Sequence, residues 1–228
     1  MTQVLQVSQG FIERYPGAHG GALVLRGAAN AATSAALEEA RREVEAELRA
    51  RYGGLDRAAL KALPTLAAYD AFYGSFGKSY HVLLQLESVV LKGKSAGRGE
   101  ALLQAMFLAE LKNQLLTAGH DLATVRLPVT LEVATGEESY TLLGGQPATL
   151  KAGDMFMGDG EGVISSVLYG PDGRTRMGPT TRDALYLVYA PRGIAAEDVR
   201  RHLEDIAALV RLAAPAAQVE SLQVVPER

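Results

Sequence analysis

The sequence predicts an α+β fold, with an N-terminal strand and helices followed by a mainly antiparallel β-sheet and a C-terminal helix. Two observations predict it. Apolar residues recur at helical spacing through much of residues 28–120 and again over 196–214, whereas between 128 and 191 short β-rich runs alternate with glycine-rich turns. The 228 residues are 48% hydrophobic and show no repeat or long linker, and a chain of this size can bury a core of its own. We therefore expect a single domain over residues 1–228.

The first expected strand spans residues 21–27, where the apolar run GALVLRG lies between glycines. A helix follows, because Leu37, Val44 and Leu48 recur near helical spacing until Gly53-Gly54 ends the pattern. Charges of alternating sign cover the other face of this helix, which is typical of a solvated surface. We assign the helix no function.

Two more helices are expected over residues 79–93 and 100–117. The second is apolar around most of its circumference, which indicates a central position in the fold. It is expected to end at Gly119, and this would place His120 and Asp121 at its C-terminal end.

Beyond residue 128 the hydrophobic pattern changes to a period of two. The expected strands are the runs VTLEVA, YTLL, MFMG, VISSVLYG and ALYLVYAP, with turns such as GDGEG and GPDGR between them. Helical spacing then returns over 196–214 and ends at Pro215. We expect an antiparallel sheet or open barrel covered by a C-terminal packing helix.

The composition excludes several kinds of chemistry. With no cysteine, the chain has no disulfide, no thiolate nucleophile and no Cys-ligated metal. The four histidines lack the spacing of metal ligands, so neither a metal nor another cofactor is expected. The start of the chain has no signal-peptide pattern, and no run of about 18 apolar residues suggests a membrane span. We expect a cytoplasmic protein with no membrane partner; nothing in the sequence indicates an oligomeric state.

Two short patterns invite a functional interpretation but are explained otherwise. Gly93-Lys94-Ser95 ends like a phosphate-binding loop, yet Ser88 stands where that motif needs its earlier glycine. Asp159-Gly160-Glu161 lacks the remaining oxygen ligands of a calcium loop, and a hairpin turn accounts for it.

A role in nucleic-acid binding depends on a local patch, because the net charge of −3 gives no general attraction to phosphate. Positive charge concentrates between residues 78 and 112, in Lys78, Lys92, Lys94, Arg98 and Lys112. The loop with Lys92, Lys94 and Arg98 is our candidate for following an RNA backbone, while ordinary surface lysines give the same pattern.

His120 is a candidate pocket residue, because Glu110, Asn113 and Thr117 would form a polar stripe that points toward it along the helix. The same stripe is also typical of the solvated face of a helix.

A second set of candidates lies in the β-rich half of the chain. Ser165 and Ser166 interrupt an apolar strand, and the turn that follows carries the carboxylate of Asp172. A serine nucleophile needs a base beside it, and no base is identified from the sequence.

In order along the chain, these residues resemble the tRNA-binding B3/B4 domain of the bacterial phenylalanyl-tRNA synthetase beta subunit. The resemblance covers residues 119–191 and is carried by His120-Asp121-Leu122, Gly136-Glu137, Leu142-Leu143-Gly144-Gly145, Gly153-Asp154 and Ser165-Ser166 leading to Gly170. In the synthetases this module hosts an editing pocket that hydrolyses tyrosine wrongly esterified to the phenylalanine tRNA.

The resemblance implies that His120 is the pocket histidine and that Asp172 stands near the place of the family's glutamate. The family's Gly-Gly-Glu is Gly170-Pro171-Asp172 here, and the shorter carboxylate changes which amino acid could be recognised. The other domains of the synthetase do not appear in this sequence.

The favoured interpretation is a free-standing B3/B4 protein that binds RNA, with the acceptor end of a tRNA as its partner and trans-editing deacylation as its candidate reaction. In that interpretation His120 and Asp172 read the aminoacyl group, Ser165 and Ser166 line the pocket or position water, and Glu110 and Asn113 support His120. The alternative is a non-catalytic binding module for a free amino acid or similar small molecule, which the net negative charge favours.

Overall fold

The computed structural model describes residues 3–30, 34–97 and 99–226, and its core is built around two sheets. The first sheet has the strand order β11-β2-β10-β3, all antiparallel, formed by Gln218–Val225, His19–Arg26, Ala184–Ala190 and Leu116–Asp121. The second has the order β1-β4-β7-β8-β9, formed by Leu5–Val7, Val129–Val133, Met155–Asp159, Gly162–Ser166 and Gly170–Pro171. A separate hairpin pairs β5 (Ser139–Thr141) with β6 (Pro147–Thr149).

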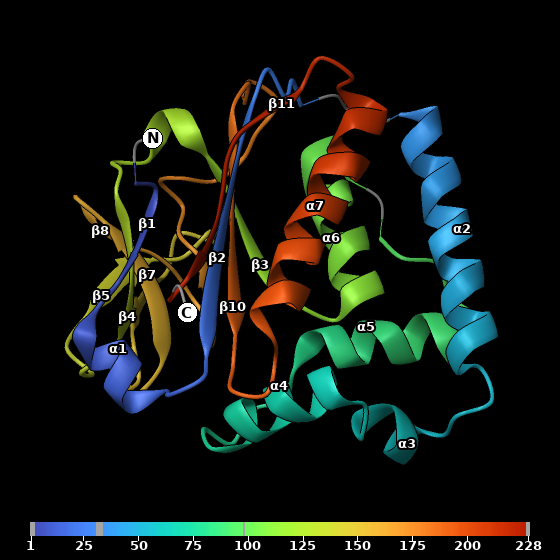
Figure 1. Ribbon diagram of the computed structural model, residues 1–228, viewed down its shortest axis with the longest axis horizontal. Coiled ribbons are helices and arrows are strands. Elements are labelled where there is room, and N and C mark those ends of the chain that lie inside the picture. Colours follow the sequence, from blue (N-terminus) through green and yellow to red (C-terminus); the bar gives the residue numbers. More distant parts are fainter. Residues whose placement is uncertain (1–2, 31–33, 98, 227–228) are drawn as a thin grey trace.

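The helices lie mainly on one side of the first sheet (Figure 1). They are α1 (Gln9–Arg14), α2 (Ala35–Tyr52), α3 (Arg57–Lys61), α4 (Pro64–Gly74), α5 (His81–Val90), α6 (Ala101–Asn113) and α7 (Ala196–Ala213). Helices α6 and α7 stand against the first sheet, α2 lies outside them, and the second sheet covers the opposite face (Figure 1). The α+β class that the sequence predicts is therefore confirmed.

Several predicted elements are present. The helix expected to end at Gly53 is α2, which begins after Ser34, whose hydroxyl accepts a hydrogen bond from the Leu37 N–H as an N-cap. The helices expected over 79–93 and 196–214 are α5 and α7, and the strand expected over 21–27 is β2. The Asp159-Gly160-Glu161 turn does connect two antiparallel strands, β7 and β8.

The helix expected over 100–117 is shorter than the sequence predicts. It ends at Asn113 because Gln114 adopts a left-handed conformation, with φ of 62°, that closes the helix. The chain then enters β3, where Ala118 lies opposite Leu187 and His120 opposite Leu185 of β10. The prediction that His120 follows a helix C-terminus is therefore wrong, since this residue lies within a strand.

The described chain also has elements at both ends that the sequence does not predict. The strand at 21–27 is preceded by β1 and α1. The C-terminal helix over 196–214 is followed by β11, which pairs with β2 at the edge of the first sheet. These end segments are joined: the Gln223 side-chain oxygen accepts hydrogen bonds from the N–H groups of Val4 and Leu5.

Two adjacent glycines in β2 let the sheet be covered closely on both faces. A Cβ atom at Gly21 would lie 2.6 Å from Val199 Cγ1 of α7, and one at Gly20 would lie 2.6 Å from Leu131 Cδ2 of the second sheet. Both distances are shorter than a carbon–carbon contact. The pair Gly20-Gly21 thus allows α7 and the second sheet to approach the same strand from opposite sides.

We expect Gly21→Ala to lower the free energy of unfolding by about 1–2 kcal/mol, because Val199 is short and branched and must move with its helix. Chemical denaturation measures the change. Gly10→Ala is the matched control, since nothing lies within 4 Å of a Cβ at that position; equal stability of the two variants would contradict the packing argument.

Candidate functional site

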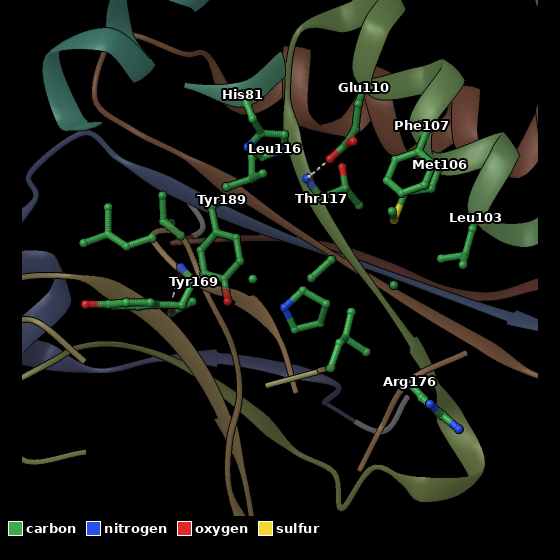
Figure 2. Close-up of a pocket in the computed structure, with 18 of the residues that line it drawn as sticks. His81, Leu103, Met106, Phe107, Glu110, Leu116, Thr117, Tyr169, Arg176 and Tyr189 are labelled. Atoms are coloured by element: carbon green, nitrogen blue, oxygen red, sulfur yellow. Dashed lines mark hydrogen bonds between the residues drawn. The ribbon is translucent and has the colours of Figure 1, made fainter. Parts of the chain in front are cut away.

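The main cavity has a volume of about 490 Å³ and lies between α6, β3, the segment joining α4 to α5, and the β8–β9 turn (Figure 2). This volume is in the range of small-molecule sites. Leu103, Met106 and Phe107 line it from α6, and Tyr189 lines it from β10. Most of its lining is apolar, so the cavity suits a ligand with a substantial apolar part.

The rim of the cavity combines exposed apolar side chains with a cation. Phe107 is 44% exposed and Leu143 is 49% exposed, although both belong to the lining. The guanidinium of Arg176 is also exposed and has no ion-pair partner among the described residues. Such a rim can contact an apolar surface and a negatively charged group together.

One end of the cavity carries a set of polar groups from the β8–β9 turn. The Ser166 hydroxyl accepts a hydrogen bond from the Tyr169 N–H at 3.2 Å. The Lys78 ammonium lies 4.0 Å from the centre of the Tyr169 ring and donates to the Leu168 carbonyl at 3.0 Å. Burial lowers the pKa of Lys78, and the nearby Lys151 lowers it further.

Asp154 lies behind this end of the cavity and is fully buried. Burial raises the pKa of its carboxyl to about 7, against the lowering effect of hydrogen bonding with Ser166. One of its oxygens has no hydrogen-bond partner in the described part of the chain. Asp154 therefore changes charge near neutral pH, next to a serine that lines the cavity.

Glu110 supplies a second buried carboxyl group, on the α6 side of the cavity. One oxygen accepts a hydrogen bond from the Thr117 N–H at 2.7 Å (Figure 2), while the other has no partner among residues 3–30, 34–97 and 99–226. Burial raises the pKa of this carboxyl to about 8. At neutral pH the group is mostly protonated, so it can donate a hydrogen bond.

His120 and Asp172 lie close together, joined by a residue that the sequence analysis did not single out. The His120 Nδ1 atom is 2.7 Å from the Thr175 hydroxyl, which donates to the Asp172 carboxylate. Burial lowers the pKa of His120 to about 3, so its ring is neutral. Neither His120 nor Asp172 lines the cavity, but Gly119, which precedes His120 in the chain, and Arg176, which pairs with His120, both do.

The two serines have different surroundings. Ser166 lines the cavity, whereas the Ser165 hydroxyl is buried and lies 2.7 Å from the Tyr189 hydroxyl. The hydroxyl groups near them belong to Tyr140 and Tyr189, and no histidine bonds to either serine within the described ranges. No serine–histidine pair for nucleophilic catalysis is formed there.

Asn113 and Glu110 do not support His120 as predicted. Asn113 instead contacts His202 and Asp205 of α7, at 3.2 and 2.8 Å. The reason is the early end of α6, which removes the continuous helical face on which the prediction depended.

The predicted RNA-binding loop lies apart from the cavity. Lys92 and Lys94 are exposed in the turn after α5, and neither lines the cavity. Arg98 lies outside the described residues. Three further lining residues are not evident from the sequence, because they come from separate segments that only the fold brings together: Tyr169, Arg176 and Tyr189.

The fold and the cavity together define an α+β protein with a cavity of ligand size. No protein-family model matches the chain, and no curated protein matches its sequence. Among solved structures it is similar to an N-terminal fragment of the phenylalanyl-tRNA synthetase beta subunit from Pyrococcus horikoshii, with 13% identity and a TM-score of 0.50. The match covers 100% of this chain and 56% of that fragment. At this identity the likeness concerns the fold alone.

No helix in the described ranges is long and apolar enough to cross a membrane.

Proposed function

We propose that this protein binds the aminoacyl end of a tRNA in the main cavity and hydrolyses the ester of a wrongly charged tRNA in trans. The observation that carries the proposal is the cavity itself, which is mostly apolar, about 490 Å³ in volume and set in a fold similar to a synthetase beta-subunit fragment. An aminoacyl group has an apolar side chain and a polar ester end, which suits this combination of surfaces.

The reaction needs few catalytic side chains. A water molecule attacks the ester carbonyl carbon, the bond to the ribose oxygen breaks, and that oxygen takes up a proton, so that free amino acid and tRNA are released. Holding the ester and the water in position accounts for much of the acceleration in such a reaction. In this proposal Ser166 orients the water or the ester, as the one predicted serine that lines the cavity.

His120 and Asp172 act in this proposal through the residues beside them. Their hydrogen bonds to Thr175 hold the segment that carries Arg176 against β3. Arg176 then meets the RNA phosphates at the rim, and Lys92, Lys94 and Arg98 extend the contact to the tRNA backbone. Replacing the fully buried His120 with alanine would also leave a void, so a substitution at the cavity wall is a cleaner test.

The test measures release of amino acid from a panel of mischarged tRNAs, including tyrosyl ester on the phenylalanine tRNA. Leu103→Trp places a larger side chain in the cavity, and Leu212→Trp is the control because Leu212 is exposed on α7 away from the cavity. We expect wild type and Leu212→Trp to deacylate one or more of the tRNAs at similar rates, and Leu103→Trp to be slower by about tenfold or more. Equal rates for both variants would contradict the proposed site.

The second candidate is a binding module for a free amino acid without chemistry, favoured by the net charge of −3. Binding of tRNA weakens steeply with salt, whereas binding of a small zwitterion does not. Absence of deacylation together with salt-independent amino-acid binding would support this second candidate and exclude the first.

A further inference from the structure

A second hollow, of about 170 Å³, is lined by residues from four helices. It is formed by the C-terminal turn of α2, the start of α4, the junction of α6 with β3, and the first turns of α7. It is distinct from the main cavity, because the two share no lining residue.

The charged side chains around this hollow are mainly cationic. Arg51, Lys112 and Arg201 line it, with Asp198 as the carboxylate among the lining residues. Arg51 lies 5.1 Å from the centre of the Tyr52 ring and makes no ion pair within the described part of the chain. Its guanidinium is therefore available to an anion.

The other two cations are only partly neutralised. Arg201 is 3.4 Å from Asp198, and both side chains are more than half exposed, so the pair is weak. Lys112 bonds to Asp205 at 2.9 Å. Arg51, Lys112 and Arg201 carry three positive charges. The carboxylates of Asp198 and Asp205 carry two negative charges, so one positive charge is in excess.

The floor of the hollow is polar and held in place. The Gln114 amide donates to the Tyr52 hydroxyl at 3.2 Å, and the Gln114 carbonyl accepts from the buried Tyr80 hydroxyl at 3.1 Å. Thr65, in the first turn of α4, adds a hydroxyl group at the edge. The Gln114 side-chain amide and the hydroxyl groups of Tyr52 and Thr65 therefore place N–H and O–H groups beside the cations.

We propose that this hollow binds a single phosphate group, through the guanidinium groups of Arg51 and Arg201 and the ammonium of Lys112. Guanidinium groups present several N–H donors in a plane that matches phosphate oxygens. A volume of about 170 Å³ is below the range of roughly 300–1,000 Å³ typical of whole small-molecule ligands. The size therefore favours one phosphate over a complete nucleotide.

The phosphate could belong to an RNA chain or be a free phosphate ion, and both present the same chemistry to the hollow. This proposal stands independently of the main cavity, because it depends on different side chains.

The test titrates inorganic phosphate, at low ionic strength, into wild type, Arg51→Ala and Arg14→Ala, and follows the backbone amide NMR signals of Thr65, Asn113 and Gln114. Arg14 is the matched control, since it is an exposed arginine that lies over the ring of its neighbour Tyr15, at 5.5 Å. We expect saturable shifts in wild type and Arg14→Ala, and an affinity about tenfold lower or more in Arg51→Ala.

A second arm titrates uncharged tRNA into the same three proteins. A larger loss of tRNA affinity in Arg51→Ala than in Arg14→Ala would assign the phosphate to RNA. If the two variants lose equal tRNA affinity while Arg51→Ala still binds inorganic phosphate more weakly, the ligand is a free phosphate ion. Absence of phosphate-induced shifts in wild type, or equal phosphate affinities for the two variants, would overturn the proposal. Failure of deacylation alone would leave the phosphate result unchanged and so bear only on the function of the main cavity.

Discussion

Tyr69→Phe is expected to lower the free energy of unfolding by about 2–4 kcal/mol. The Tyr69 hydroxyl is fully buried, accepts a hydrogen bond from the Leu116 N–H at 2.8 Å and donates to the Tyr189 carbonyl. Phenylalanine keeps the ring, which stacks on Tyr80 with a centroid distance of 4.1 Å, but leaves both backbone groups without this partner. An unsatisfied buried polar group costs about 1–3 kcal/mol.

Chemical denaturation at pH 6 measures this loss, and Tyr52→Phe is the control. The Tyr52 hydroxyl accepts from the Gln114 side chain rather than from a buried backbone group of the sheet, so its removal should cost about 1 kcal/mol or less. Because Leu116 and Tyr189 both line the main cavity, Tyr69→Phe should also weaken ligand binding there. Equal stabilities of the two variants would show that Tyr69 does not bridge β3 and β10.

Glu110→Gln is expected to change how stability depends on pH. The pKa of this carboxyl rises from 4.5 to about 8 through burial, so the folded protein holds a proton that the unfolded chain releases above pH 4.5. The stability contributed by this group is therefore fully present below pH 4.5 and is lost as pH rises toward 8. Glutamine has the same shape, can still accept from the Thr117 N–H and does not titrate.

Relative to wild type, the unfolding free energy of Glu110→Gln should increase with pH. The increase is about 1.4 kcal/mol per pH unit between pH 4.5 and about 8. The full change is on the order of 3–5 kcal/mol. Denaturation curves at several pH values measure it. Glu137→Gln, in an exposed turn, is the control and should follow wild type at every pH; a parallel curve for Glu110→Gln would contradict the protonated state of Glu110.

Other buried groups shape the wild-type profile, which is why the difference between variants is the quantity to compare. Burial lowers the pKa of both His120 and His202 to about 3, so folding keeps them neutral where the unfolded chain binds protons. Their contribution is present above the unfolded pKa of 6.5 and is lost as pH falls toward 3. Burial raises the pKa of Asp154 to about 7, so this carboxyl, like that of Glu110, contributes stability that is lost as pH rises.

The elements predicted best from the sequence are those whose hydrophobic pattern is local. Helices α2 and α7 have apolar residues at helical spacing and clear ends, at Gly53 and Pro215. The sequence predicts the helix over 100–117 to include the first two residues of β3, Leu116 and Thr117, because apolar residues there fit the helical pattern. The conformation of β3 is decided by the turn at Gln114 and by pairing with β10, which lies about seventy residues further along the chain.

The candidate site could be predicted only in part, because it too depends on contacts between segments that are far apart in the sequence. Glu110 and Ser166 were named from the sequence and do line the main cavity. Asp172 and His120 are brought together by Thr175, and no spacing rule identifies a hydroxyl that bridges two distant segments. The roles of all these residues in binding or catalysis stay predictions for the experiments above.

The position of β2 has a consequence for how this protein is made. Its partners in the sheet are β10 and β11, and the nearest of these pairings joins residues that are far apart in the sequence, such as Ala184 and Leu25. During synthesis from the N-terminus, the apolar segment GGALVLR therefore emerges long before either neighbouring strand exists. Contacts of this kind slow folding and leave unpaired strand edges exposed on the ribosome. The nascent chain should accordingly be a substrate for chaperones that bind short hydrophobic segments until β10 has been translated.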